Sequence, residues 1–90
     1  KKDVKSAQDL TKTELQGVAK LVGAKGLGSN HVIKNSIRNV LDLADKNVKE
    51  FVKISKHNLL GVGKILGIKG RHKMKKRELH HKIMKHPKLH

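Results

Sequence analysis

The chain contains no cysteine, tryptophan or tyrosine, and Phe51 and Pro87 are its single phenylalanine and its single proline. Without cysteine it has neither a disulfide scaffold nor the ligands of a Cys-based zinc finger or an iron–sulfur cluster. One ring is too few for the aromatic platform on which single-stranded nucleic acid stacks. No uninterrupted apolar run approaches the ~18 residues of a membrane span. These absences exclude several large classes of binding and redox protein.

Acidic residues are scarce and lysine is abundant. The 90 residues include 22 lysines and arginines against 7 acids, which gives a net charge of +15, far from the magnitude of about 2–8 that suits a small domain. Only Arg38, Arg71 and Arg77 are arginines. Proteins that read bases depend on arginine for bidentate contacts to guanine, whereas lysine-rich amphipathic helices suit anionic membranes. The charge therefore favours a membrane surface over sequence-specific DNA.

The chain reads as an imperfect duplication with an offset of 44 residues. The segment 17–26 (GVAKLVGAKG) returns as 61–70 (GVGKILGIKG), and residues 1–26 match residues 45–70 at 11 positions. With two residues inserted in the second copy, Ile33 matches Leu79 and Ile37 matches Ile83. We expect one domain, residues 1–90, built of two repeats at 1–44 and 45–88.

Each copy predicts two amphipathic helices, so the expected fold is all-α: a small bundle of about four helices from a duplicated helix–loop–helix unit. Apolar residues recur at helical spacing over 4–22, with Val4 and Ala7 on the same face, and over 48–66. A second helix begins near Ser29 or Asn30 and presents an apolar face. That face comprises Val32, Ile33, Ile37, Val40, Leu41 and Ala44.

The expected helix ends rest on capping signals. Residues 11–14 (TKTE) and 47–50 (NVKE) have the form of capping boxes, and the first would start its helix late, near Lys12. Gly26 and Gly70 stand where a left-handed C-cap is expected. Nothing strong stops the second helix before Asp45, so a helix that continues into the second copy is an alternative.

Glycines within the helices allow two interpretations. Each interior glycine costs ~1 kcal/mol of helix stability relative to alanine. Small residues let two helices approach closely, and they also keep a helix marginal in water until it meets lipid. The sequence leaves both interpretations open for Gly17, Gly61 and Gly63, and also for Gly23 and Gly67 if the helices run to Gly26 and Gly70.

The last twenty residues, 71–90, predict a highly basic, histidine-rich tail. They hold five of the seven histidines and eight basic residues against one acid. Histidines titrate near ~6.5, so mild acid would add charge and strengthen binding to anions. No dedicated metal site or other cofactor is expected, and the weak candidate ligands are His80, His81, His86 and His90.

We expect no enzyme, because no nucleophile, base and orienting group can be assembled from the spacing of the histidines and acids. In composition and patterning, residues 4–26 and 48–70 resemble linear cationic host-defence peptides, which are cysteine-free, Lys/Gly-rich and helical. The chain begins at Lys1 without an initiator methionine, so we expect either a processed mature form or a fragment of a longer protein, and we expect it to be secreted.

The leading hypothesis is a secreted cationic protein that binds and disrupts anionic membranes, as an antimicrobial or cytolytic agent, with self-association but no small-molecule substrate. The expected membrane-binding cations are Lys20, Lys25, Lys49, Lys53, Lys56, Lys64, Lys69, Arg71, Lys73, Lys75, Lys76 and Arg77. The expected insertion face is Leu15, Val18, Leu21, Val22, Phe51, Leu59, Val62, Ile65 and Leu66. The alternatives are a nucleic-acid or acidic-glycan binder of low specificity and an extracellular or gamete recognition protein.

Overall fold

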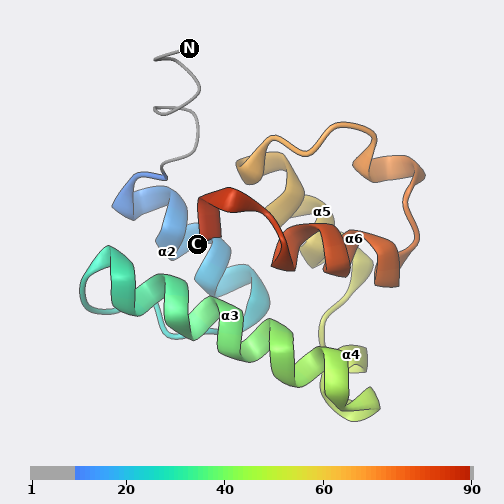
Figure 1. Ribbon diagram of the computed structural model, residues 1–90, viewed down its shortest axis with the longest axis horizontal. Coiled ribbons are helices and arrows are strands. Elements are labelled where there is room, and N and C mark those ends of the chain that lie inside the picture. The colour runs from blue at the N-terminus through green and yellow to red at the C-terminus, as the bar shows by residue number, and fades with distance from the viewer. Residues whose placement is uncertain (1–9, 90) are drawn as a thin grey trace.

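The chain folds into five α-helices and two short 3₁₀-helices, as a computed structural model that describes residues 10–89 shows (Figure 1). No strand occurs in that range, so the prediction of an all-α fold is confirmed. The radius of gyration is 12.4 Å, close to the ~12 Å of a compact domain of this length. The elements are α2 (Lys12–Val22), α3 (Asn30–Lys46), α4 (Val48–Lys53), α5 (Lys56–Leu66), η1 (Arg71–Lys73), α6 (Lys76–Met84) and η2 (Pro87–Leu89).

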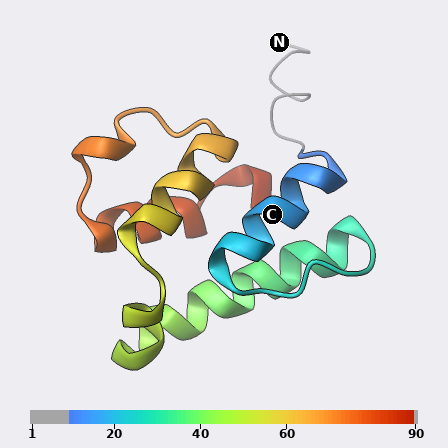
Figure 2. The same ribbon diagram turned by 180° about the vertical axis from the view of Figure 1, so that it is seen from behind.

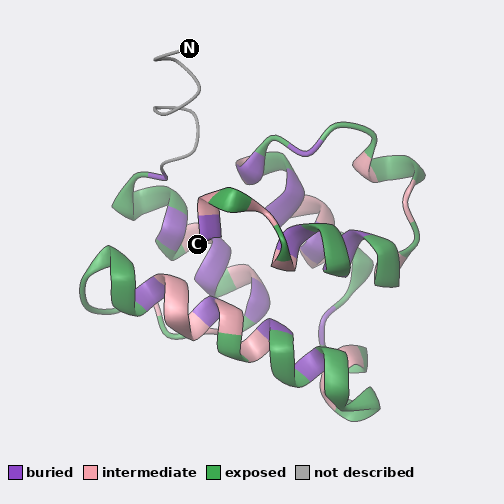
Figure 3. Ribbon diagram, viewed as in Figure 1, coloured by how far each residue is buried: buried purple, intermediate pink, exposed green. Residues whose placement is uncertain are grey.

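A single apolar core lies between α2, α3, α5 and α6, and each of them buries one face (Figure 3). The apolar side chains recur every three or four residues along these helices, which is why one stripe of each can be covered. Val32, expected on the buried face of α3, is instead 48% exposed because it lies beside the stripe of Ile33, Ile37, Leu41 and Ala44 that faces the core. Val4 and Ala7 lie outside the described residues.

α2 and α5 begin and end in the same way. The Thr11 hydroxyl accepts the Glu14 N–H at 3.1 Å, and the Glu14 carboxylate accepts the Thr11 N–H at 3.0 Å, so the first capping box is confirmed. Ser55 caps α5, accepting the Asn58 N–H at 3.0 Å. The start at Lys12 is therefore correct, and the longer helix from residue 4 is not supported within the described range.

The C-caps are Gly23 and Gly67, so their assignment to Gly26 and Gly70 is wrong. Gly23 has φ 78° and Gly67 has φ 77°, and the residue after each glycine returns its N–H to the carbonyl five residues earlier. This Schellman pattern stops each helix directly after its last core residue and turns the next apolar side chain inward. Gly70 does have φ 73°, but it introduces η1.

Residues 48–66 form two helices, not one, and α3 does not continue into the second copy. Asn47, with φ −130° and ψ 116°, ends α3 and starts α4. Ile54 is also extended, which takes its side chain into the core with 4% exposed, and Ser55 then caps α5. Each break satisfies backbone donors with a polar side chain, so it interrupts the helix at little energetic cost.

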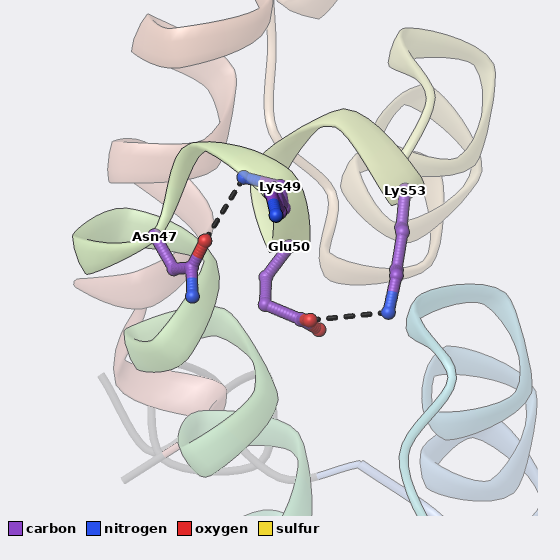
Figure 4. A network of polar contacts seen from close by, with 4 residues as sticks. All are labelled: Asn47, Lys49, Glu50 and Lys53. Carbon is purple, nitrogen blue, oxygen red and sulfur yellow. Dashed lines mark hydrogen bonds and ion pairs between the residues drawn. The ribbon is translucent and has the colours of Figure 1, made fainter.

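The expected capping box at residues 47–50 forms only in part. The Asn47 side chain accepts the Lys49 N–H at 3.0 Å, whereas Glu50 turns to the Lys53 ammonium at 3.1 Å (Figure 4). α4 is thus a short capped helix of six residues at the corner between α3 and α5, and none of its residues is buried.

α2 and α5 pack against each other through a reciprocal contact. A Cβ atom added at Gly17 would lie 3.7 Å from Ile65 Cδ1, and one added at Gly61 would lie 3.1 Å from Leu21 Cδ1. In each contact, the glycine of one helix meets the residue four positions after the glycine of the other helix. Gly17 thus meets Ile65, and Gly61 meets Leu21. Gly17 and Gly61 are thus points of close helix approach, whereas Gly23 and Gly67, expected inside their helices, end them.

The C-terminal segment is part of the core rather than a solvated tail. Leu79, Ile83 and Leu89 are fully buried, and the Arg38 guanidinium donates to the Leu89 carbonyl at 2.7 Å. The helix of this segment, α6, is short, because η1 (Arg71–Lys73) precedes it and it ends at Met84.

Candidate functional site

The cations expected to bind membranes lie mainly on the surface. Arg71 and Lys76 are half-buried, and the other ten are exposed. Three ion pairs occur among the described residues, and two of them use these cations: Lys53 with Glu50 at 3.1 Å, and Arg77 with Asp45 at 4.0 Å. Much of the positive charge therefore faces solvent without neutralisation by a neighbouring acid.

The expected insertion face forms the interior of the protein. Six of its nine residues are at most 4% exposed, and the remaining three, Leu21, Phe51 and Ile65, are partly buried around that core. The six buried residues are Leu15, Val18, Val22, Leu59, Val62 and Leu66. The folded protein thus presents lysines outward and keeps these apolar stripes inside.

A groove of about 420 Å³ lies between α2, α5 and η1, and we call it the α5 groove. Figure 2 shows α5 passing between α2 and the loop that leads to α6. α2 contributes Leu21 to the wall, and the 3₁₀ turn contributes Arg71 and His72. The α5 side chains are His57, Leu60, Gly61 and Lys64.

The α5 residues of this groove form one helical stripe. Positions 57, 60, 61 and 64 follow the spacing i, i+3, i+4, i+7, which places them on one face. Sequence reasoning followed the core stripe at 59, 62 and 66 and missed this one. Its signal was available: two apolar or small residues flanked one turn away by a histidine and a lysine.

Two features position Arg71 at the α5 groove. Its guanidinium donates to the Ile68 carbonyl at 3.0 Å. Its side-chain stem crosses Gly63, where an added Cβ would lie 3.2 Å from Arg71 Cδ. Because Gly63 has no side chain, the aliphatic part of Arg71 packs close against α5. Of the described residues that line the groove, none is acidic.

A second groove of about 440 Å³ lies between α2, α3 and the α4–α5 corner. Leu21 separates it from the α5 groove, since that side chain lines both. Its rim differs in charge because Glu50 and Lys53, which both lie on α4 and line this groove, form an ion pair (Figure 4). This groove has a mixed rim, whereas the α5 groove has a basic one.

Phe51 engages two of the predicted membrane cations. The Lys76 ammonium lies 4.3 Å from the ring centroid and donates to the Phe51 carbonyl at 2.7 Å, and the Arg77 guanidinium carbon lies 4.5 Å from the same centroid. His80 meets the ring edge-on at 5.5 Å. These contacts hold α6 to α4, so Lys76 and Arg77 have a structural role.

His80 is fully buried, although it lies in the segment predicted to be a basic tail. Its Nε2 lies 2.9 Å from the Leu41 carbonyl, which can only accept, so Nε2 carries the proton, and Nδ1 has no partner among the described residues. Burial lowers the pKa of His80; the Leu41 carbonyl and Asp45 from α3 oppose this, while Arg77 and His81 from α6 add to it. The fold therefore holds this ring neutral.

The other weak metal candidates do not assemble into a site. Among residues 10–89, no group of three histidines or acids could hold a metal ion. His81 is exposed, and the His86 ring accepts the Lys88 N–H at 3.2 Å. Burial, with a smaller effect from Lys88, lowers the pKa of His86. His90 lies outside the described residues.

None of the described helices is both long enough and apolar enough to span a bilayer. No protein family, curated protein or solved structure matches the chain. Its function must therefore be argued from its own charges, grooves and packing.

Proposed function

We propose that this protein is a secreted membrane-active agent, antimicrobial or cytolytic, that adsorbs to anionic bilayers through its lysines and disrupts them when its helices separate. The observation that carries the proposal is the division of each amphipathic helix into a lysine-bearing outer face and an apolar inner face. Cations near an anionic membrane contribute up to ~1 kcal/mol each, so a surface with this many exposed lysines supports strong adsorption.

Disruption requires the inner faces to turn outward. α2 and α5 have 11 residues each, or about 16 Å of helix, which is too short to cross the hydrocarbon layer. They are instead suited to lie in the plane of the interface with Leu15 or Leu59 toward the acyl chains. Helices that open from a small core need little rearrangement beyond loss of their mutual packing.

We infer further that α2–α3 and α5–α6 are two copies of one helix–loop–helix unit arranged as a four-helix bundle, with α4 as a connecting turn. The 44-residue offset relates the ends of α2 to those of α5, and the reciprocal glycine contact relates their packing. Ile33 and Ile37 of α3 are fully buried, as are their counterparts Leu79 and Ile83 of α6.

Dye release from lipid vesicles tests the membrane function. Vesicles of phosphatidylcholine with phosphatidylglycerol should leak at physiological salt, whereas vesicles of phosphatidylcholine alone should remain sealed. Absence of leakage from both would refute the proposal. Binding of duplex DNA and of heparin, measured against salt concentration, would then decide whether the charge serves a polyanion, because counterion release makes such binding fall steeply with salt.

A further inference from the structure

The α5 groove combines a basic rim with an apolar floor. Lys64 and Arg71 carry positive charge, His57 and His72 add nitrogen donors, and no acid lines the groove among the described residues. Leu21 and Leu60 supply apolar surface beside these groups. An anion that also carries hydrocarbon is complementary to both parts of the groove.

Two glycines give the groove its form. Because Gly61 has no side chain, Leu21 packs directly against the α5 backbone, so the apolar surface of the groove lies close to this helix. Because Gly63 has none, the Arg71 stem lies across α5, and the hydrogen bond to Ile68 fixes its guanidinium end. An arginine held in this way loses little side-chain entropy when it binds phosphate, and its planar donors match phosphate oxygens.

We propose that the α5 groove binds the phosphate headgroup of a single anionic lipid, with Lys64 and Arg71 on the phosphate and the first acyl carbons over Leu21 and Leu60. The second groove lacks this match, because Glu50 stands on its rim and would repel the anion. The inference rests on the proposed function, and it adds a headgroup site to what would otherwise be adsorption by diffuse charge. Free phosphate shares the headgroup chemistry but has no use for the apolar floor.

Amide chemical shifts of the whole protein, titrated with short-chain lipid below its micelle concentration, test the site. Dihexanoyl phosphatidylglycerol should shift the amides of Gly61, Lys64 and His72 in a saturable way. Dihexanoyl phosphatidylcholine and inorganic phosphate should each bind more weakly by about tenfold or more, because each lacks one of the two complementary parts.

Variants separate a built site from total charge. Lys64→Gln with Arg71→Gln should weaken binding of the anionic lipid by about tenfold. The matched control, Lys12→Gln with Lys82→Gln, removes two positive charges from exposed positions outside both grooves and should change affinity by about twofold or less. Since Arg71 also holds its own turn, Lys64→Gln with His72→Gln provides a second variant that leaves that turn intact, and it too should bind more weakly than the control.

Three results would overturn the site: equal loss in the groove variants and the control, saturable shifts centred on the second groove, or phosphate binding as tightly as the lipid. Vesicle assays on the same proteins keep the two proposals apart. Leakage without saturable lipid binding in the α5 groove would refute the site alone, and saturable binding without leakage would refute the disruptive function alone.

Discussion

At the scale of single residues, His80 shows how burial fixes a protonation state. Its Nε2–H has an acceptor and its Nδ1 has none, so a proton added to Nδ1 would create a buried charge with an unsatisfied donor. This burial could not be predicted from the sequence, because His80 lies among cations in the most highly charged segment of the chain. Leu79 and Ile83, in contrast, align with Ile33 and Ile37 of an expected apolar face, although the charged residues around them make the helix pattern of this segment weak.

The lowered pKa of His80 predicts loss of stability in mild acid. The unfolded ring titrates near ~6.5 and the folded ring at lower pH, so the stabilisation is complete above about pH 6.5 and declines as pH falls below it. The urea concentration at the midpoint of unfolding should therefore decrease as the pH is lowered from about 7 to about 5. His80→Gln should flatten this dependence, and His81→Gln, at an exposed position, should not. The pKa of His86 is lowered too, so the double variant His80→Gln with His86→Gln should show a still weaker dependence of stability on pH. An unchanged pH dependence in His80→Gln would contradict this account.

Gly17 and Gly61 form a matched pair for testing the helix contact. Alanine at Gly17 would make an ordinary contact with Ile65 at 3.7 Å, so Gly17→Ala should stabilise the protein by about 0.5–1 kcal/mol through helix propensity. Alanine at Gly61 would press on Leu21 at 3.1 Å and should gain less or lose stability. Urea unfolding of both variants measures the difference, and a larger gain at Gly61 would show that the contact is loose.

At the scale of helices, the caps decide where each element ends. The box at residues 11–14 was predictable because both partners of its reciprocal hydrogen bonds are written in the sequence. The break before α5 was harder to see, since the apolar spacing runs through it. Thr11 and Ser55 nevertheless correspond under the 44-residue offset, and transfer of the first cap to the second copy would have located it. The C-caps were assigned to the wrong glycines because two glycines, three residues apart, stand near the end of each helix. They are Gly23 and Gly26 for α2, and Gly67 and Gly70 for α5.

The choice between those candidates can be measured. Gly23→Ala should destabilise the protein by about 1–2 kcal/mol, because its φ of 78° forces a Cβ into a left-handed conformation. Gly26→Ala should be nearly neutral, since Gly26 has no positive φ and an added Cβ would make only ordinary contacts. Thermal unfolding measures both variants. An equal loss of stability in Gly23→Ala and Gly26→Ala would contradict the assignment of the C-cap to Gly23.

At the scale of the whole molecule, composition and periodicity predicted the helical class, the core stripes and the outward lysines. They could not predict the grooves, because these depend on how α2 and the turn after α5 are placed around one helix. The α5 groove needs Leu21 from α2 and Arg71 from η1, and no local spacing joins them.

A reversible cross-link tests whether membrane disruption needs the bundle to open. The chain has no cysteine, so Gly17→Cys with Ile65→Cys places the only pair of thiols at the facing positions of α2 and α5. The oxidised protein should still bind anionic vesicles but release dye about tenfold more slowly, and reduction should restore release, since separation of the helices is then permitted. Equal dye release by the oxidised and reduced forms would mean that the protein permeabilises vesicles while α2 and α5 remain packed together.

The reciprocal contact between α2 and α5 has a consequence for assembly. Two identical subunits related by a two-fold axis make isologous interfaces, in which position i of one meets position j of the other and the reverse also holds. Gly17 with Ile65 and Leu21 with Gly61 obey that rule once the offset of 44 residues is removed. On the proposed duplication, the α2–α5 interface inside this chain corresponds to a homodimer interface whose two subunits have been joined. On the same proposal, a polypeptide carrying either copy alone keeps a self-complementary surface, and we expect it to pair with a second molecule of itself.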